Sequence, residues 1–387
     1  MTGPRPAERT ARAFREVFGT WPEGVWCAPG RVNLMGEYTD VNEGFVLPLA
    51  VPLTVRAAVS RRTDGLLRLH SRELPSGAAE LRVDGLLPGG GAGWTAYPAG
   101  AVWALRAAGH AVAGADVHLE SSLPMGSGLA SSAAVEVATA LAFADLHGLG
   151  LSPGKLAVLC RRAENEFAGV PCGIMDQTAS ACCTEGHLLH LDTRDLARRH
   201  VPFDLAGQGL RLLVVDSGVV HRLGDGAYAR RRASCEEGAR ALGVRALRDV
   251  APEHLDDALG RLADPVVRAC VRHVVTENRR VGEVTGLLDA GHVRAVGPVL
   301  TAGHASLRDD LRVSCAELDL AVESANAAGA LGARMTGGGF GGSAIVLVDA
   351  GAADAVSRAV GHAFAGAGLR APRISSVVAA GGARRLA

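Results

Sequence analysis

The chain has 387 residues, 48% of them hydrophobic and 21% charged, which is enough length for two domains and a large core. Forty basic and forty acidic residues cancel, which disfavours a general nucleic-acid or membrane-surface binder, because such proteins carry a basic excess. No apolar run reaches the ~18 residues of a membrane span, the first residues lack the apolar region of a secretion signal, and the eight cysteines form no CxxC pair. We therefore expect a cytoplasmic protein with reduced cysteines that binds neither nucleic acid nor membrane.

The first half of the chain shows helical and strand patterns. Apolar residues at helical spacing predict helices over residues 7–18, 95–108 and 131–147, and from residue 152 onward. β-Branched or alternating runs predict strands over residues 54–60, 65–70 and 116–121. The last of these strands reads as half-buried, with Val117 and Leu119 facing inward.

The second half begins with a stretch that reads as irregular, residues 196–209. Helical patterns follow over residues 226–242, 264–290 and 316–328, and strand patterns over residues 210–215 and 343–348. Helices and strands alternate without a regular βαβ rhythm, which favours an α+β protein. We predict two domains, an N-terminal lobe of residues 1–195 and a C-terminal lobe of residues 196–387.

A glycine-rich turn follows the strand over 116–121. Residues 124–134, Pro-Met-Gly-Ser-Gly-Leu-Ala-Ser-Ser-Ala-Ala, run straight into an alanine-rich helix. Glycines let backbone N–H groups approach a ligand closely, and a helix N-terminus adds oriented donors and partial positive charge. The turn therefore predicts a phosphate cradle; an ordinary glycine loop with serine helix caps is the alternative.

A second glycine run, residues 337–342, matches the spacing GxGxxG. A dinucleotide-binding fingerprint needs a strand before the glycines and a helix after them. Here a strand follows, so we reject that interpretation and expect a loop that covers a ligand. A plain glycine-rich strand connection is the alternative.

Two further groups of polar residues indicate chemistry. The segment 27–44 gathers Arg31, Glu37 and Asp40 between apolar stretches, and short carboxylates and amides of this kind grip hydroxyl-rich ligands such as sugars. Glu164 could hold Mg²⁺ together with substrate phosphates, and Asp176 could act as a base. A solvated polar loop in the first case, and ion pairs with arginine in the second, remain open.

Taken together, these motifs resemble the galactokinases of the GHMP kinase superfamily. The resemblance covers nearly the whole chain from residue 21, and it rests on the segments 30–48, 124–134, 172–177, 306–319 and 335–342. It implies a two-lobed α+β GHMP kinase fold, with an N-terminal lobe like ribosomal protein S5 domain 2 and a ferredoxin-like C-terminal lobe. It also implies transfer of the γ-phosphoryl group of ATP to the C1 hydroxyl of D-galactose, with Mg²⁺ as cofactor, by a protein that we expect to be a monomer.

The resemblance also implies roles for individual residues. Asp176 would take or orient the proton of the sugar hydroxyl, and Arg31 would stabilise both Asp176 and the transferring phosphoryl group. The residues that would bind the sugar are Glu37, Tyr38, Asp40, Gly173, Asp176 and Tyr228. Those that would bind ATP are Trp94, Gly126, Ser127, Gly128, Leu129, Ala130, Ser131 and Ser132. The metal would lie near Ser132 and Glu164.

Three positions depart from the family pattern, which commonly has His where this chain has Tyr38, Tyr where it has Val41 and Ser where it has Ala130. The change at Tyr38 leaves the sugar tolerance open. A kinase for arabinose, N-acetylgalactosamine or galacturonate is therefore one alternative, although no extra basic residue is present for galacturonate. A non-catalytic sensor of galactose and ATP is the other, although Ser131, Ser132 and the alanines after them are complete.

Overall fold

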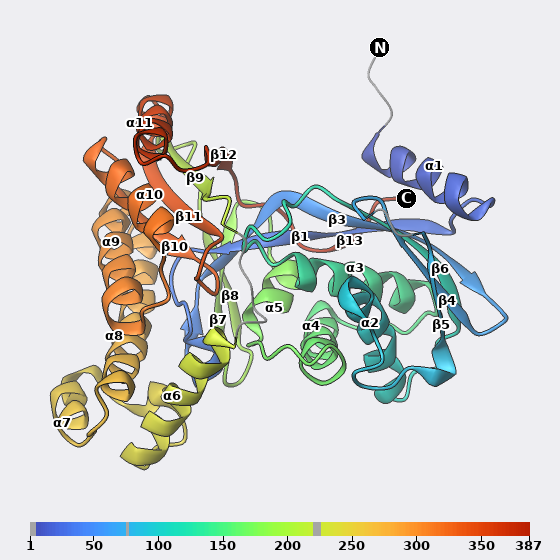
Figure 1. Ribbon diagram of the computed structural model, residues 1–387, viewed down its shortest axis with the longest axis horizontal. Coiled ribbons are helices and arrows are strands. Elements are labelled where there is room, and N and C mark those ends of the chain that lie inside the picture. Colours follow the sequence, from blue (N-terminus) through green and yellow to red (C-terminus); the bar gives the residue numbers. More distant parts are fainter. Residues whose placement is uncertain (1–4, 75–76, 220–225) are drawn as a thin grey trace.

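The computed structural model describes residues 5–74, 77–219 and 226–387. A six-stranded sheet forms the first lobe, with the strand order β13-β1-β3-β6-β4-β5. Its strands are β1 (Gly24–Asn33), β3 (Pro48–Arg62), β4 (Leu66–Ser71), β5 (Ala79–Arg82), β6 (Gly114–Ser121) and β13 (Arg384–Arg385). The long central strands β1 and β3 pair antiparallel and carry the apolar core of this lobe (Figure 1).

Helices cover both faces of this sheet (Figure 1). Helix α1 (Pro6–Phe18) lies on one face against β3 and β6. The other face carries α2 (Ala96–Ala107), α3 (Ser131–Leu146), α4 (Pro153–Arg162) and α5 (Met175–Cys182). All of the helices predicted in this half are confirmed. Helix α4 begins with Pro153 directly after residue 152, and Ser152 caps it by accepting the backbone N–H of Lys155.

The expectation that the strand over 116–121 is half-buried is wrong. Its second face is also buried, because α1 packs on it. That face carries His118 and Glu120, and Glu120 accepts hydrogen bonds from Thr10 of α1 and from Arg56 of the neighbouring strand. Polar residues that are paired in this way tolerate burial, so the alternation of polar and apolar residues does not report exposure here.

The second lobe contains a four-stranded antiparallel sheet with the order β10-β11-β9-β12. These strands are β9 (Leu210–Asp216), β10 (Gly332–Thr336), β11 (Ser343–Asp349) and β12 (Arg373–Val377). Read from β12 to β10, these are the fourth, first, third and second strands of the lobe in chain order, which is the ferredoxin-like arrangement that we expected. Its helices are α6 (Ala227–Leu242), α7 (Leu255–Gly260), α8 (Pro265–Asp289), α9 (Val296–Ser306), α10 (Ala316–Ala327) and α11 (Ala353–Gly366).

A small third sheet, β2-β7-β8, lies beside the large one. It comprises β2 (Phe45–Val46), β7 (His187–Asp192) and β8 (Arg198–Pro202). Strand β8 falls in the stretch that we expected to be irregular. It is a mostly exposed edge strand, Arg-Arg-His-Val-Pro, so it carries no apolar alternation that could reveal it.

The domain boundary at residue 195 stays a prediction. The strands β8 and β13 lie after that residue, yet they pair with β7 and β1, which lie before it.

Among the described residues, no helix combines the length and apolar character that crossing a membrane requires.

Candidate active site

A cavity of about 330 Å³ collects nearly all of the predicted site residues. Its wall includes Arg31, Glu37, Tyr38, Asp40, Trp94, Gly126, Gly128, Leu129, Ala130, Ser131, Ser132, Glu164, Gly173, Asp176 and Tyr228. They come from β1, the 36–45 loop, the turn before α2, the 124–130 loop, the start of α3, the helical turn after α4, the segment leading into α5, α5 itself and the start of α6. Residues from across 200 positions of sequence thus meet in one site of ordinary ligand-binding size.

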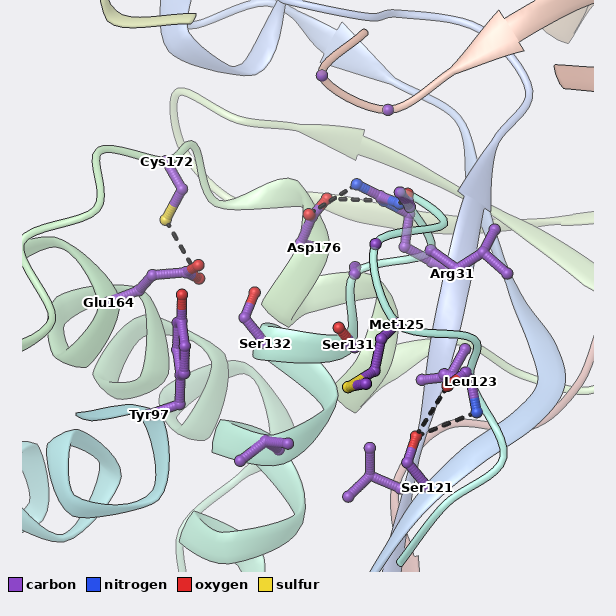
Figure 2. Close-up of a pocket in the computed structure, with 18 of the residues that line it drawn as sticks. Arg31, Tyr97, Ser121, Leu123, Met125, Ser131, Ser132, Glu164, Cys172 and Asp176 are labelled. Atoms are coloured by element: carbon purple, nitrogen blue, oxygen red, sulfur yellow. Dashed lines mark hydrogen bonds and ion pairs between the residues drawn. The ribbon is translucent and has the colours of Figure 1, made fainter. Parts of the chain in front are cut away.

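Arg31 and Asp176 form a two-pronged ion pair in this cavity (Figure 2). The Nε and Nη2 atoms of Arg31 donate to the two carboxylate oxygens of Asp176, each at 2.7 Å. Such bidentate pairs are strong and geometrically specific. The Arg31 side chain is 5% exposed and that of Asp176 is 27% exposed, so the carboxylate is the partner that reaches the open cavity.

The 124–130 loop approaches the same pair. Nη1 of Arg31 donates to the carbonyl oxygen of Gly128 at 2.7 Å. Gly126, Gly128 and Ala130 all have φ between 59° and 74°, and Ala130 directly precedes α3. This left-handed backbone curls the loop around the N-terminus of α3, where Ser131 and Ser132 begin the helix, and forms a cradle suited to phosphate oxygens.

Ser127 is the exception among the predicted residues. It is 2% exposed, and its hydroxyl donates to the carbonyl oxygen of Pro124 at 2.8 Å. Its own carbonyl oxygen accepts the Ser343 hydroxyl at 2.8 Å, from the first residue of β11. Ser127 therefore shapes the loop and ties it to the second lobe.

The 36–45 loop brings two carboxylates to the opposite wall. Oε1 of Glu37 accepts the backbone N–H of Gly337 at 2.7 Å and the Thr336 hydroxyl at 3.1 Å. Burial raises the pKa of Glu37 to about 7, although Arg334 and Arg31 oppose the rise. Burial, together with the nearby negative charge of Asp176, raises the pKa of Asp40 to about 6.

Gly173 leaves the space that Asp40 occupies. A Cβ atom added at Gly173 would lie 1.7 Å from the Oδ2 atom of Asp40. A side chain at position 173 would therefore displace the Asp40 carboxylate. Glycine fits this position because the carboxylate approaches its backbone closely.

Tyr38 and Tyr228 pack against each other beside these carboxylates. Their ring centroids are 4.9 Å apart. Tyr38 has φ of 65°, and its hydroxyl donates to the carbonyl oxygen of Gly338 at 2.7 Å. The glycine run 337–342 is thus fastened to the 36–45 loop, and its Gly337 and Gly338 line the cavity; that the run covers a ligand stays a prediction.

Glu164 lies in a π-helical turn, Ala163–Phe167, at the end of α4. Burial raises the pKa of Glu164 to about 7, and the nearby negative charge of Asp176 adds to the rise. The amide of Gln177 donates to Glu164 at 2.5 Å and to Glu136 at 3.3 Å. Figure 2 shows the oxygen ends of Glu164, Ser132 and Tyr97 turned toward one another. This corner therefore gathers two buried carboxyl groups, Glu164 and Glu136, around one amide.

Sequence reasoning missed Glu136 and Tyr97. Glu136 follows Ser132 by four residues on α3, so helical spacing could have placed it on the same face. Tyr97 lies on α2, whose apolar pattern gives no signal of a polar contact.

The fold and the glycine-rich loop at the start of α3 are those of a GHMP kinase. The family model for the GHMP kinases N terminal domain matches residues 96–184, and the GHMP kinases C terminal model matches residues 285–366. A third model, the galactokinase galactose-binding signature, matches residues 12–61. The chain belongs to the galactokinase family of these kinases and is an ATP-dependent sugar kinase.

Relatives of known name support this assignment over the full length. A galactokinase from Streptomyces coelicolor is 61% identical over 385 residues, which cover 99% of this chain and 100% of the relative. A galactokinase from Mycobacterium bovis is 44% identical over 92% of this chain and 97% of the relative. The solved structure of a Lactococcus lactis galactokinase complexed with galactose matches with a TM-score of 0.94 and 31% identity, over 97% of this chain and 98% of that one. A mevalonate kinase structure, 18% identical with a TM-score of 0.64, covers 92% of this chain and 98% of that one, and shares the fold.

Proposed function

We propose that this protein transfers the γ-phosphoryl group of ATP to the C1 hydroxyl of D-galactose, giving galactose 1-phosphate and ADP. The observation that carries the proposal is the Arg31–Asp176 pair, which lies between the phosphate cradle and the carboxylates of the 36–45 loop. The relatives named galactokinase, and the neighbour solved with galactose, support the choice of sugar.

The two sides of the cavity would take the two substrates. On the sugar side, carboxylates, a backbone and an aromatic pair offer acceptors and a packing surface, from Glu37, Tyr38, Asp40, Gly173, Asp176 and Tyr228. On the nucleotide side, the cradle and Trp94 would hold the phosphates and the base, through Gly126, Gly128, Leu129, Ala130, Ser131 and Ser132, with Ser127 shaping the loop. The sugar C1 hydroxyl would then face the γ-phosphate beside Asp176.

Phosphoryl transfer depends mainly on positioning and on charge stabilisation. Asp176 would accept a hydrogen bond from the C1 hydroxyl and orient or take its proton as the new P–O bond forms. Arg31 holds both carboxylate oxygens, and its guanidinium would also stabilise negative charge on the transferring phosphoryl oxygens. An arginine suits this role because it stays charged and presents a planar fork.

The residues at Ser132 and Glu164 fit Mg²⁺. Both offer oxygen, the ligand that this hard cation prefers, and Glu164 lies buried beside further negative charge that a cation would offset. Among the described residues, no group of three or more His, Cys, Asp and Glu side chains is arranged to hold a metal. Two protein ligands agree with a cation that takes its remaining ligands from water and substrate phosphates. Bound there, Mg²⁺ would neutralise charge on the β- and γ-phosphates.

We further propose that the chain divides into lobes near residue 195, acts as a monomer and works in the cytoplasm on small molecules, without nucleic acid or membrane partners. One chain supplies both substrate walls, which supports a monomer. The eight cysteines are all free, which supports a reducing compartment, and the balanced charge supports the absence of polyanionic partners.

ADP release from Mg-ATP with a panel of sugars tests this function. The panel holds galactose, glucose, N-acetylgalactosamine, galacturonate and arabinose. We expect release with galactose far above that with the other sugars. Faster release with another sugar would contradict the substrate and move specificity to residues 37–40. Binding of galactose and ATP without turnover would favour a sensor.

A further inference from the structure

The 36–45 loop is held at both ends by two consecutive residues of α8, in the other lobe. Oε1 of Glu277 accepts the backbone N–H groups of Gly36 at 3.0 Å and Glu37 at 3.3 Å. Oδ1 of Asn278 accepts the backbone N–H of Phe45 at 2.9 Å. One turn of α8 thus accepts backbone hydrogen bonds from both ends of the 36–45 loop.

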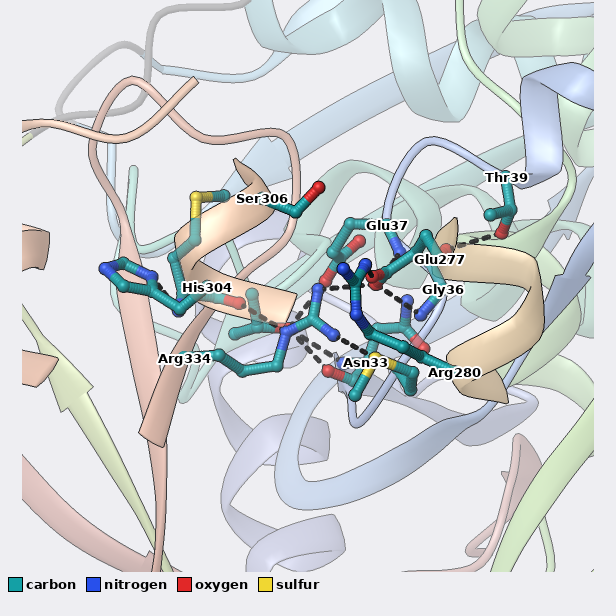
Figure 3. A network of polar contacts seen from close by, with 12 residues as sticks. Asn33, Gly36, Glu37, Thr39, Glu277, Arg280, His304, Ser306 and Arg334 are labelled. Atoms are coloured by element: carbon teal, nitrogen blue, oxygen red, sulfur yellow. Dashed lines mark hydrogen bonds and ion pairs between the residues drawn. The ribbon is translucent and has the colours of Figure 1, made fainter. Parts of the chain in front are cut away.

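Glu277 is itself held by two arginines (Figure 3). Its Oε1 atom pairs with Nη2 of Arg334 at 2.8 Å, and its Oε2 atom accepts Nη1 of Arg280 at 3.0 Å. Glu277 and Arg334 are both fully buried. Burial opposes ionisation, yet Arg334, His273 and Arg280 hold the pKa of Glu277 at about 2. The loop is therefore anchored to a charged acceptor, and hydrogen bonds to charged groups are stronger than neutral ones.

The anchor acts on the residue that presents a carboxylate to the cavity. The Glu37 backbone is bonded on its N–H side by Glu277, and its carbonyl oxygen lies 3.1 Å from Nε2 of His273, also on α8. The Glu37 carboxylate meets Gly337 beyond β10, the strand that carries Arg334. Two second-lobe elements, α8 and β10, therefore set where Glu37 lies.

We propose that Glu277 and Asn278 are positioning residues for sugar affinity, which act by fixing the backbone of the 36–45 loop so that Glu37 and Asp40 keep their places in the cavity wall. This inference rests on the proposed function, because it takes the sugar to bind at that wall. Glu277 and Asn278 are not among the residues that line the cavity. Their effect should fall on the sugar and leave the nucleotide side unchanged.

The test is galactose affinity, measured by calorimetry without ATP, in Glu277→Gln and Asn278→Ala. We expect a loss of affinity of about tenfold for Glu277→Gln and a smaller loss for Asn278→Ala, since hydrogen bonds to charged groups contribute more than neutral ones. In steady state, KM for galactose should rise while KM for ATP stays within about twofold, the scatter expected at an uncoupled site. Arg279→Gln is the matched control, because Arg279 is the next residue on the same helix and is exposed.

A double-mutant cycle with Glu37→Gln separates positioning from a general structural role. If Glu277 acts through Glu37, Glu277→Gln should cost at least about threefold less affinity in the Glu37→Gln background. Additive losses would overturn the proposal, as would unchanged galactose affinity in either variant. Asn278→Ala removes no charge, so it keeps the test decisive if Glu277→Gln does not fold. Failure of the wild-type chain to bind galactose would instead refute the proposed function.

Discussion

Substitution of Gly173 by alanine tests the sugar wall with a single methyl group. The added Cβ would lie 1.7 Å from the Oδ2 atom and 2.2 Å from the Cγ atom of Asp40. Carbon and oxygen atoms do not approach so closely, so the Asp40 carboxylate must retreat by about 1.5 Å or more to reach van der Waals distance. The change adds no charge, and the backbone at position 173 is not in the left-handed region.

The expected cost follows from that displacement. A misplacement of about 1 Å in a positioned group can cost about 10²-fold in rate, so kcat/KM for galactose should fall by about that factor. Because we propose that Asp40 binds the sugar, most of the loss should appear in galactose KM and in galactose affinity. ATP affinity should change little.

The assay is steady-state kinetics with galactose and ATP varied in turn, together with calorimetry of galactose binding. Gly286→Ala is the control, since a Cβ there meets nothing within 4 Å and Gly286 lies within α8, where alanine favours the helix. Gly173→Ala with wild-type galactose KM and affinity would refute the placement of Asp40 at the sugar.

Four further predictions follow from the site. Asp176→Asn should lower kcat by about 10²–10⁴-fold while galactose and ATP still bind, and a wild-type kcat would remove Asp176 from catalysis. Ser132→Ala or Glu164→Ala should raise the Mg²⁺ concentration needed for half-maximal rate; an unchanged Mg²⁺ titration would contradict the metal assignment. Because the pKa of Glu37 is about 7, galactose affinity should fall as pH drops below that value, and Glu37→Gln should remove the part of this dependence near pH 7 while leaving the part near pH 6 that belongs to Asp40. The same raised pKa also affects stability: between pH 4.5 and 7 the unfolded chain loses the Glu37 proton while the folded protein keeps it, so the free energy of unfolding decreases as pH rises. Tm should therefore fall less over this range in Glu37→Gln. Identical pH profiles of the two proteins would argue against both effects. Tyr38→His should change the ratios of kcat/KM among galactose, 2-deoxygalactose and a C6-modified galactose more than it changes ATP affinity, and equal ratios before and after would count against Tyr38 as a sugar contact.

Local patterns were enough to predict the helices and the glycine turn before α3. Helical spacing located α1, α2, α3 and α8, and glycines at 126 and 128 before a serine-started helix marked the turn, whose role as a phosphate cradle stays a prediction. These signals lie within a few residues of each other, where chain geometry alone determines what is close. The resemblance to galactokinases then supplied the order in which the distant motifs meet.

Contacts between distant residues could not be predicted in this way. Glu277 and Gly36 are 241 positions apart, and nothing in the helical pattern of α8 distinguishes Glu277 from a solvated glutamate. The burial of Glu120 likewise depends on α1, which covers β6 from the far side of the sheet. The edge strand β8 was not predicted, because three of its five residues are exposed arginine or histidine.

The central claim is transfer of phosphate to C1 of galactose at the Arg31–Asp176 pair. The most direct measurement is ³¹P and ¹³C NMR of the product formed from Mg-ATP and galactose labelled with ¹³C at C1, with Asp176→Asn run alongside. We expect phosphorus coupled to the labelled carbon with the wild-type protein, and no product over the same time with the variant. Phosphate on another carbon, or the same product at the same rate from Asp176→Asn, would contradict it.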